Sequence, residues 1–250
     1  MNLKIKFLLL FILIASFFVN GCASVKPRQE SSSLKCSSLV NNYTAGVSVK
    51  HRRIKYTRLG NGQKVILLIA SIHGNEKAGT PLLNKFCDYL KHNCNLLSGK
   101  TVIIVPIVNP DGFANDTRYN QNKIDLNRNF PADNRINSEL NGSFPLSEPE
   151  SWNLYRIVNK YKPARIITFH ESLGCIDYDG PAEDLAKRLA DKCRLPAKKL
   201  GARPGSLGSY VGLTLNTPII TVELTEEDSK KSAKQLWNDY KDMLLETIDY

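Results

Sequence analysis

The chain has 250 residues and a formal net charge of +10 at pH 7, with 34 Lys and Arg against 24 Asp and Glu. Its basic residues are scattered along the chain, which argues against a nucleic-acid-binding protein, and no Cys-x-x-Cys pair is present to build a thiolate metal site. About 200 residues follow the amino-terminal segment without an internal repeat or a second linker, which suits one domain with a substantial core.

The amino terminus has the features of an export signal. Lysines precede an apolar stretch over residues 7–19, which is too short to span a bilayer, and Gly21-Cys22 follows it. This ending resembles a bacterial lipoprotein signal, in which the cysteine is lipidated and becomes the first residue. We expect residues 1–21 to form such a signal peptide and Cys22 to carry the lipid; a conventional signal peptide is the alternative.

This signal would place the protein in the periplasm, where nucleic acid is not a partner. Ala23 after the cysteine, rather than aspartate, fits sorting to the outer membrane of a Gram-negative cell. Residues 22–45 are Ser-rich and weakly hydrophobic, which is the composition of a flexible tether. The folded domain is therefore expected over residues 46–250, joined to the membrane through tether and lipid.

Within that domain, apolar runs predict buried strands at residues 65–70, 101–108, 166–169 and 219–224. Helical patterns lie between and after them, at residues 82–90, 148–161, 181–193 and 229–248. Strands that alternate with helices indicate an α/β domain with a mostly parallel sheet.

Metal-ligating residues follow two of the predicted strands. His73-Gly74-Asn75-Glu76 comes shortly after the run over residues 65–70, and His170 directly follows residues 166–169. Two histidines and one carboxylate make a catalytic zinc set, which leaves the fourth position open for water. The carboxyl ends of strands are where an open α/β sheet places its active site. The sequence therefore predicts one zinc ion per chain, bound by His73, Glu76 and His170.

Five segments, in order along the chain, strongly resemble the zinc carboxypeptidase family. They are His73–Glu76, Asn109–Gly112, Arg118 with residues 125–131, His170, and Thr221–Leu224. Within the family the chain is most similar to the murein peptide amidases, which cut tripeptides derived from the bacterial cell wall, and residues 176–181 and 204–210 also look typical of that branch. The resemblance implies that residues 46–250 form a catalytic domain with a mixed eight-stranded sheet between helices.

The resemblance also implies roles around the metal. Asp125 matches the carboxylate that accepts a hydrogen bond from His73 and so fixes the orientation of its ring. Arg118 matches the arginine that polarises the scissile carbonyl and stabilises the oxyanion. Glu223 matches the general base and acid; the alternative is an ordinary strand carboxylate, but a charge among apolar residues is costly to bury without a role.

Substrate-binding residues follow from the same resemblance. Asn127 and Arg128 match the pair that binds the terminal carboxylate of the substrate, a task that suits the two parallel donors of a guanidinium. Leu207 would lie near the floor of the specificity pocket. Arg203 could contact an acidic substrate, but a solvated loop arginine is the simpler interpretation.

Two positions depart from the family pattern. Lys123 and Ile124 precede Asp125 where relatives usually have glycine and valine, so the turn there must be made with an ordinary backbone. The mobile tyrosine that some relatives carry before the last strand has no clear counterpart. Tyr210 is at the wrong spacing for it, and core packing explains that residue at least as well.

Five cysteines remain after Cys22, and they are Cys36, Cys87, Cys94, Cys175 and Cys193. An exported protein can oxidise them, but an odd number leaves at least one unpaired. Cys87 and Cys94 could pair only if a helix ends between them, and Cys175 with Cys193 is also possible. Spacing alone does not determine the connectivity.

The expected function is that of a zinc exopeptidase acting on peptidoglycan peptides, and the favoured bond joins γ-D-glutamate to meso-diaminopimelate in the free murein tripeptide. One alternative is a carboxypeptidase for ordinary peptides or for stem peptides still attached to glycan. A second is an amidohydrolase of the succinylglutamate desuccinylase or aspartoacylase type. A third, of a different class, is a catalytically silent lipoprotein that binds the cell wall.

Overall fold

The structure is a computed structural model that describes residues 36–249. The expected signal peptide, the lipidation site at Cys22 and the tether as far as residue 35 lie outside the described residues. Within the described part, no helix is both long enough and apolar enough to cross a bilayer.

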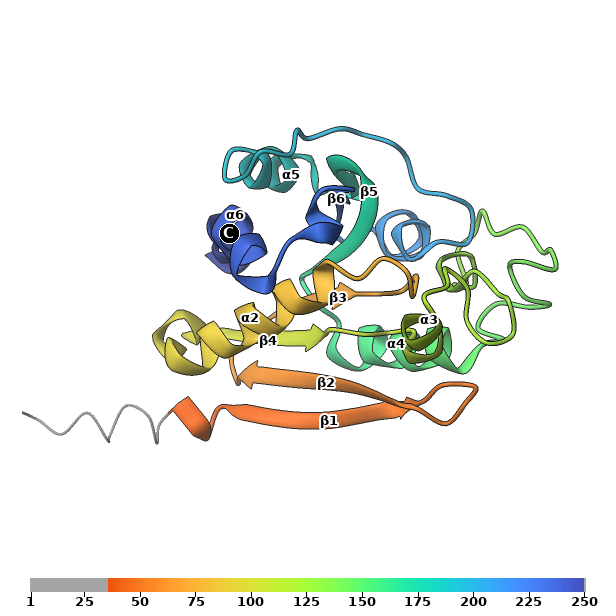
Figure 1. The fold of residues 1–250 in the computed structure, drawn as a ribbon, viewed down its shortest axis with the longest axis horizontal. Helices are drawn as coiled ribbons and strands as arrows, with labels where there is room; N and C mark the ends of the chain where they lie inside the picture. The colour runs from red at the N-terminus through yellow and green to blue at the C-terminus, as the bar shows by residue number, and fades with distance from the viewer. Residues whose placement is uncertain (1–35, 250) are drawn as a thin grey trace, which may run out of the picture.

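A mixed sheet forms the centre of the domain (Figure 1). Its strands are β1 (Val40–Val47), β2 (Arg53–Gly60), β3 (Lys64–Ala70), β4 (Lys100–Val105), β5 (Arg165–Asp179) and β6 (Ile219–Thr225). In the order β1-β2-β4-β3-β5-β6, β2 pairs antiparallel with both β1 and β4, and each neighbouring pair from β4 to β6 is parallel. The four predicted strands are all present, and the α/β class with a mixed sheet is confirmed.

The expectation of eight strands is wrong, because the sheet of the described residues has six. β5 explains part of the difference, since its register along β6 reverses after Leu173. Residues 166–172 pair with β6 in ascending order, and residues 175–179 pair with the same strand in descending order. The two halves of β5 therefore border β6 along both of its edges, and β5 is visible as one long, curved strand in Figure 1. A further segment joins only through a single bridge between Ala197 and Ile176.

Helices cover both faces of the sheet, and they are α2 (Gly79–His92), α3 (Pro110–Asn115), α4 (Pro149–Tyr161), α5 (Glu183–Ala190) and α6 (Ala233–Asp249). The period of two in the strands separates two apolar clusters. In β3, Ile66 and Leu68 belong to the cluster under α2, α5 and α6, whereas Leu67 and Ile69 belong to the cluster under α4. The strands therefore read as continuous apolar runs because both of their faces are buried.

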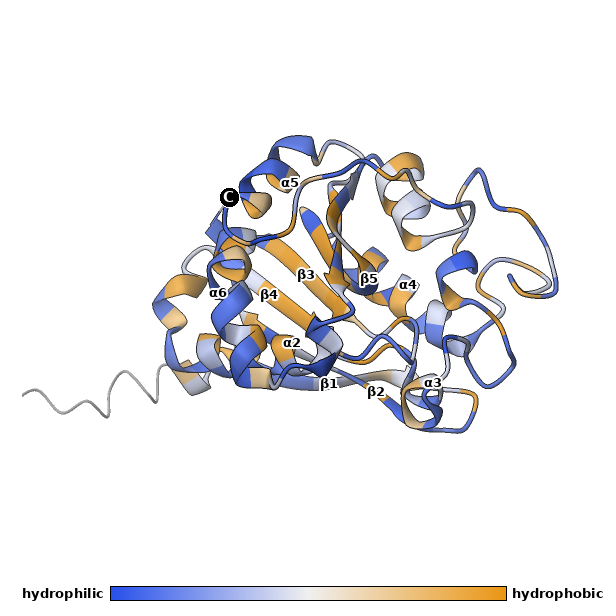
Figure 2. Cartoon of the chain, turned by 45° about the horizontal axis from the view of Figure 1, so that its top comes forward, coloured by the Kyte–Doolittle hydropathy of each residue, from blue (hydrophilic) through white to orange (hydrophobic). Residues whose placement is uncertain are grey.

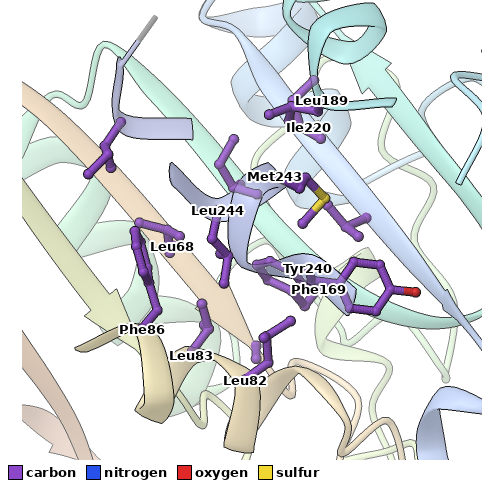
Figure 3. Close-up of a cluster of buried hydrophobic side chains, with 14 of the residues drawn as sticks. Leu68, Leu82, Leu83, Phe86, Phe169, Leu189, Ile220, Tyr240, Met243 and Leu244 are labelled. Carbon is purple, nitrogen blue, oxygen red and sulfur yellow. The ribbon is translucent and has the colours of Figure 1, made fainter. Parts of the chain in front are cut away.

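Figure 2 shows the resulting layers, with apolar strands enclosed by helices that carry hydrophilic residues. The predicted helical face of α2 is confirmed, because Leu82, Leu83, Phe86 and Leu90 are all fully buried. In Figure 3, the first three of these side chains lie close to Tyr240 and Leu244 of α6. This packing fixes α2, and α2 begins directly after the predicted metal-binding turn.

The tether ends earlier than residue 45, because β1 starts at Val40 and pairs with β2. The sequence of β1, VNNYTAGV, has few apolar residues because β1 is an edge strand. Its composition therefore resembles that of a linker. Tyr43 stacks on Tyr56 with ring centroids 5.1 Å apart, and the side chain of Asn153 in α4 donates to the carbonyl of Val47 at 3.4 Å. Residues 40–47 are therefore part of the folded domain.

A disulfide joins Cys36, just before β1, to Cys94, just after α2. The two pairings considered from spacing are wrong, because Cys87, Cys175 and Cys193 are free. Cys87 lies within α2 with its side chain buried in the core, whereas Cys94 begins a new 3-10 turn beyond the end of the helix. Cys94 is therefore directed to the amino-terminal strand and away from its neighbour in sequence.

We expect the Cys36→Ser variant to lose about 4 kcal/mol of unfolding free energy, because the disulfide closes a loop of 58 residues in the unfolded chain. Urea unfolding of the purified proteins measures the difference. Cys94→Ser should cost the same, and the double variant no more than either single one. An additive loss in the double variant would contradict a bond between these two residues.

Candidate active site

Three ligand atoms converge at the carboxyl ends of β3 and β5. The Nδ1 atoms of His73 and His170 lie 3.2 Å apart, and each contacts one oxygen of the Glu76 carboxylate, at 2.8 and 2.7 Å. All three side chains are buried, and they form the group of the described residues that could hold a metal ion. The structure thus brings the three predicted zinc ligands together.

This donor set fits zinc. A tetrahedral ion with Zn–N bonds of about 2.0–2.1 Å requires ligand nitrogens roughly 3.3 Å apart, close to the separation of the two Nδ1 atoms. Imidazole and carboxylate donors are those of catalytic zinc sites with three protein ligands.

Close backbone contacts place the turn that follows β3. Ser71 adopts a φ of 49°, and its hydroxyl donates to the carbonyl of Glu76 at 3.0 Å. A Cβ atom on Gly74 would lie 2.0 Å from the carbonyl carbon of Gly112, so only glycine fits there. Asn109 caps the short helix that contains Gly112, accepting its N–H at 2.9 Å. The segment 109–112 therefore serves to support the ligand turn.

Asp125 links the metal ligands to the substrate side of the site. One of its oxygens accepts from Nε2 of His73 at 3.0 Å and from the N–H of Asn127 at 2.9 Å. Burial alone would raise the pKa of this carboxyl, but the hydrogen bond from His73 and the charge of Arg118 hold it well below its usual range. An ionised partner keeps the His73 ring in the orientation that leaves Nδ1 to the metal.

Arg118 spans two carboxylates. Its Nε and Nη2 donate to the second oxygen of Asp125 at 3.2 and 2.9 Å, and its Nη1 donates to Glu76 at 3.2 Å. The side chain is 36% exposed, so its guanidinium is reachable from solvent beside the ligand set. This is the position that a donor to a substrate carbonyl needs.

Asn127 and Arg128 lie in a single 3-10 turn that Asp125 caps. The side-chain oxygen of Asn127 accepts from the N–H of Leu207 at 2.9 Å, which ties two distant loops together. Nη1 of Arg128 donates to the carbonyl of Asn127 at 2.6 Å. Leu207 itself is buried in the apolar cluster under α4.

Glu223 lies in β6 opposite His170 of β5 in the sheet register. Its Oε2 atom is buried and has no hydrogen-bond partner among the described residues, and burial raises the pKa of the carboxyl. The neighbouring carboxylate of Glu171 differs, because its Oε1 accepts from the N–H of Ala78 at 2.6 Å. Of these two carboxylates beside His170, Glu223 is the one with a buried oxygen that has no hydrogen-bond partner in the described part of the chain.

The two departures from the family pattern are explained. Lys123 has a φ of 64°, so a non-glycine residue adopts the left-handed conformation in the turn before Asp125. Tyr210 is a core residue, since it is buried and stacks on Phe130 with centroids 6.4 Å apart. Leu200 is 38% exposed on the loop before that residue.

Three supporting side chains were not recognised in the sequence. Asn129 is fully buried and bonds the carbonyls of Asn141 and Phe144, so it organises the loop over residues 131–147. Asp177 accepts from the N–H of Leu200 at 2.8 Å, and Asp179 from Lys199 at 2.7 Å. The signal was present, because both aspartates interrupt an apolar strand at alternate positions, the spacing of one sheet face.

Comparison with known proteins places this site in a family. The sequence profile of the zinc carboxypeptidases matches residues 30–184. Murein peptide amidase A of Escherichia coli strain K12 is 33% identical over 187 residues, covering 68% of this chain and 74% of the relative. Carboxypeptidase E of Caenorhabditis elegans is 32% identical over 133 residues, covering 42% of this chain and 28% of the relative.

Comparison with solved structures finds the same fold in related proteins. The murein-tripeptide amidase of Escherichia coli O157 superposes with a TM-score of 0.64 at 26% identity, covering 84% of this chain and 92% of that one. The carboxypeptidase A of Helicoverpa armigera has a TM-score of 0.71 at 18% identity, covering 88% and 71%, which shows the shared fold. With its buried His-Glu-His site, the chain is a metallopeptidase and belongs to the zinc carboxypeptidase family.

Proposed function

We propose that this chain is an exopeptidase that hydrolyses peptidoglycan-derived peptides next to a free carboxylate. The observation that carries the proposal is the shared anchor at Asp125, which bonds His73 on one side and the N–H of Asn127 on the other. Metal ligands and carboxylate-binding residues are thereby held at a fixed separation. A substrate gripped by its terminal carboxylate would present the adjoining bond to the metal centre.

The residues of the chain divide the reaction between them. When bound by His73, Glu76 and His170, zinc would polarise the carbonyl and acidify water as a Lewis acid. Glu223 accepts the proton of the attacking water and returns it to the leaving amine, a role that suits a carboxyl whose pKa is raised by burial. Arg118 donates to the oxygen on which negative charge develops. Asn127 and Arg128 hold the carboxylate of the leaving residue.

The proposed bond joins γ-D-glutamate to meso-diaminopimelate in the free murein tripeptide. Similarity to murein peptide amidase A over 68% of the chain supports this substrate above the ordinary peptides of the carboxypeptidases. The metal ligands, Arg118 and Glu223 are all present, which disfavours a catalytically silent wall-binding protein. An amidohydrolase of the desuccinylase type is disfavoured by the Asn109–Gly112 segment and its contact with the ligand turn.

The test uses the full chain, exported, purified in detergent and loaded with zinc. It is incubated with L-Ala-γ-D-Glu-meso-diaminopimelate, with the same tripeptide attached to its disaccharide, and with an ordinary peptide, and products are identified by mass spectrometry. Release of free diaminopimelate from the free tripeptide alone supports the proposal. If the glycan-attached form is cleaved, or if only the ordinary peptide is cleaved, that compound takes the place of the free tripeptide as the proposed substrate. If none of the three is cleaved, the proposed exopeptidase activity is rejected.

We also propose that the protein is exported and anchored at the outer membrane through a lipid on Cys22.

 The disulfide between Cys36 and Cys94 supports this location, because such bonds persist in oxidising compartments. We expect a Cys22→Ser variant to lose the lipid and to move from the membrane fraction to the soluble fraction. Mass spectrometry of the mature amino terminus measures the modification. An unmodified Cys22 in the wild-type protein would contradict the anchor and favour a conventional signal peptide.

A further inference from the structure

Arg118, Arg128 and Arg203 lie on loops that contact one another, and of these three only Arg118 forms an ion pair with a carboxylate of the described residues. Arg118 forms ion pairs with Asp125 and Glu76. The Arg128 side chain donates a hydrogen bond to the backbone carbonyl of Asn127, and no carboxylate of the described residues forms an ion pair with Arg128 or Arg203. Arg128 and Arg203 are therefore two guanidiniums of these loops that have no carboxylate ion-pair partner among the described residues.

Arg203 belongs to a loop that is fixed to the carboxylate-binding turn. The carbonyl of Gly205 accepts from the N–H of Phe130 at 3.0 Å, and the N–H of Leu207 donates to Asn127 at 2.9 Å. A Cβ atom on Gly205 would lie 2.5 Å from the carbonyl oxygen of Arg128, so the two backbones are in direct contact. Arg203 stands two residues before this contact, at the exposed start of the loop.

The backbone of Arg203 is itself held in place. Its carbonyl accepts from the N–H of Ser206 at 3.0 Å and from the hydroxyl of Ser209 at 2.8 Å. Lys199, the nearest cation before Arg203 in sequence, bonds Asp179 and is neutralised. Arg203 is the cation of this loop closest in sequence to the contact between Gly205 and Arg128, and it has no ion pair among the described residues.

The positive charge of Arg203 acts on the guanidinium of Arg128. Burial lowers the pKa of Arg128, and the like charges of Arg118 and Arg203 lower it further, whereas Asp125 opposes the shift. A ligand with one carboxylate would neutralise Arg128 and leave Arg203 unbalanced. A ligand with two carboxylates would neutralise both, which favours a dianionic substrate.

We propose that Arg203 is a specificity-determining residue that binds a second carboxylate of the substrate, beside the terminal carboxylate bound by Asn127 and Arg128. This assignment rests on the proposed function and names the class of substrate more narrowly. In the murein tripeptide, two groups have the required chemistry. They are the distal carboxylate of diaminopimelate and the α-carboxylate of the γ-linked D-glutamate.

The experiment compares three peptides with the full, zinc-loaded chain. The first is L-Ala-γ-D-Glu-meso-diaminopimelate, the second carries L-lysine in place of diaminopimelate, and the third carries D-isoglutamine in place of D-glutamate. Each replacement removes one carboxylate. KM and kcat are measured for the wild type, for Arg203→Gln and for Arg156→Gln, a matched loss of an exposed arginine in α4, outside the site.

We expect Arg203→Gln to raise KM about tenfold for the complete tripeptide, with little change in kcat, because a partly exposed charge-assisted hydrogen bond is lost. The variant should have no effect on the one peptide that lacks its carboxylate partner. The peptide on which the variant has no effect shows which carboxylate Arg203 binds. If it is the lysine peptide, Arg203 binds the distal carboxylate of diaminopimelate; if it is the isoglutamine peptide, Arg203 binds the α-carboxylate of D-glutamate. Arg156→Gln should change none of these values.

Equal loss on all three peptides, or no loss on any, would overturn the role of Arg203 while leaving the proposed function intact. If the wild type cleaves none of the three, the proposed substrate is wrong and the role of Arg203 falls with it. The two failures are thus distinguished by the activity of the wild-type protein.

Discussion

Replacement of Glu223 by glutamine is expected to lower kcat on the murein tripeptide by about 10²–10⁴-fold, the range attributed to a positioned general acid and base. Glutamine keeps the shape of the side chain but cannot accept the proton of water at neutral pH. The ligands His73, Glu76 and His170 are unchanged, so zinc should remain bound at one per chain. Steady-state kinetics and metal analysis of the same preparation measure both quantities.

The variant should also be no less stable than the wild type. Oε2 of Glu223 is buried without a hydrogen-bond partner among the described residues, and burial raises the pKa of the carboxyl, so an ionised group there is costly. A neutral amide removes that cost. Thermal unfolding of the two proteins checks this expectation and separates lost chemistry from lost structure.

Glu227→Gln is the matched control, because the same substitution is made at an exposed carboxylate shortly after β6. It should leave kcat and zinc content unchanged. Glu171→Gln tests the other carboxylate beside His170, whose hydrogen bond to Ala78 suggests a supporting role. Retained turnover in the Glu223 variant, with loss in the Glu171 variant, would transfer the role of base to Glu171.

The metal ligands could be predicted from the sequence because their signals are local. His73 and Glu76 lie three residues apart in one turn, and His170 directly follows an apolar run. The carboxyl ends of parallel strands meet at one edge of a sheet, so strands predicted separately already place these residues together. The structure adds the distances, which require the positive φ of Ser71 and the close approach of Gly74 to Gly112.

Other features depend on contacts between distant segments, which a single sequence does not contain. The hydrogen bond between Asn127 and Leu207 joins residues 80 positions apart, and the disulfide of Cys36 joins residues 58 positions apart. β1 was read as a tether because an edge strand has little apolar surface to bury. The reversal of register within β5 could not be predicted, because only its first half carries a continuous apolar run, whereas Asp177 and Asp179 interrupt the second half.

Replacement of Arg118 by alanine is the second large effect that we expect, with kcat lower by about 10²–10³-fold, the cost of losing one oxyanion donor. Nε and Nη2 of Arg118 bond Asp125, which leaves Nη1 as the donor turned toward the metal ligands. Because that donor acts as charge develops, KM should change little. The measurement is the kinetics on the murein tripeptide, with zinc content determined in parallel.

A structural role for Arg118 predicts a different pattern, because its loss would act through Asp125 and His73. Asp125 keeps its hydrogen bonds to His73 and to the N–H of Asn127 when Arg118 is absent, so we expect zinc to stay bound. Added guanidinium ion should restore part of kcat in Arg118→Ala, since the cation can occupy the vacated, partly exposed position. Arg128→Gln should instead raise KM, because the role proposed for Arg128 is to bind the carboxylate of the substrate in the ground state. Loss of zinc together with kcat, without rescue by guanidinium, would make Arg118 a positioning residue for the metal ligands.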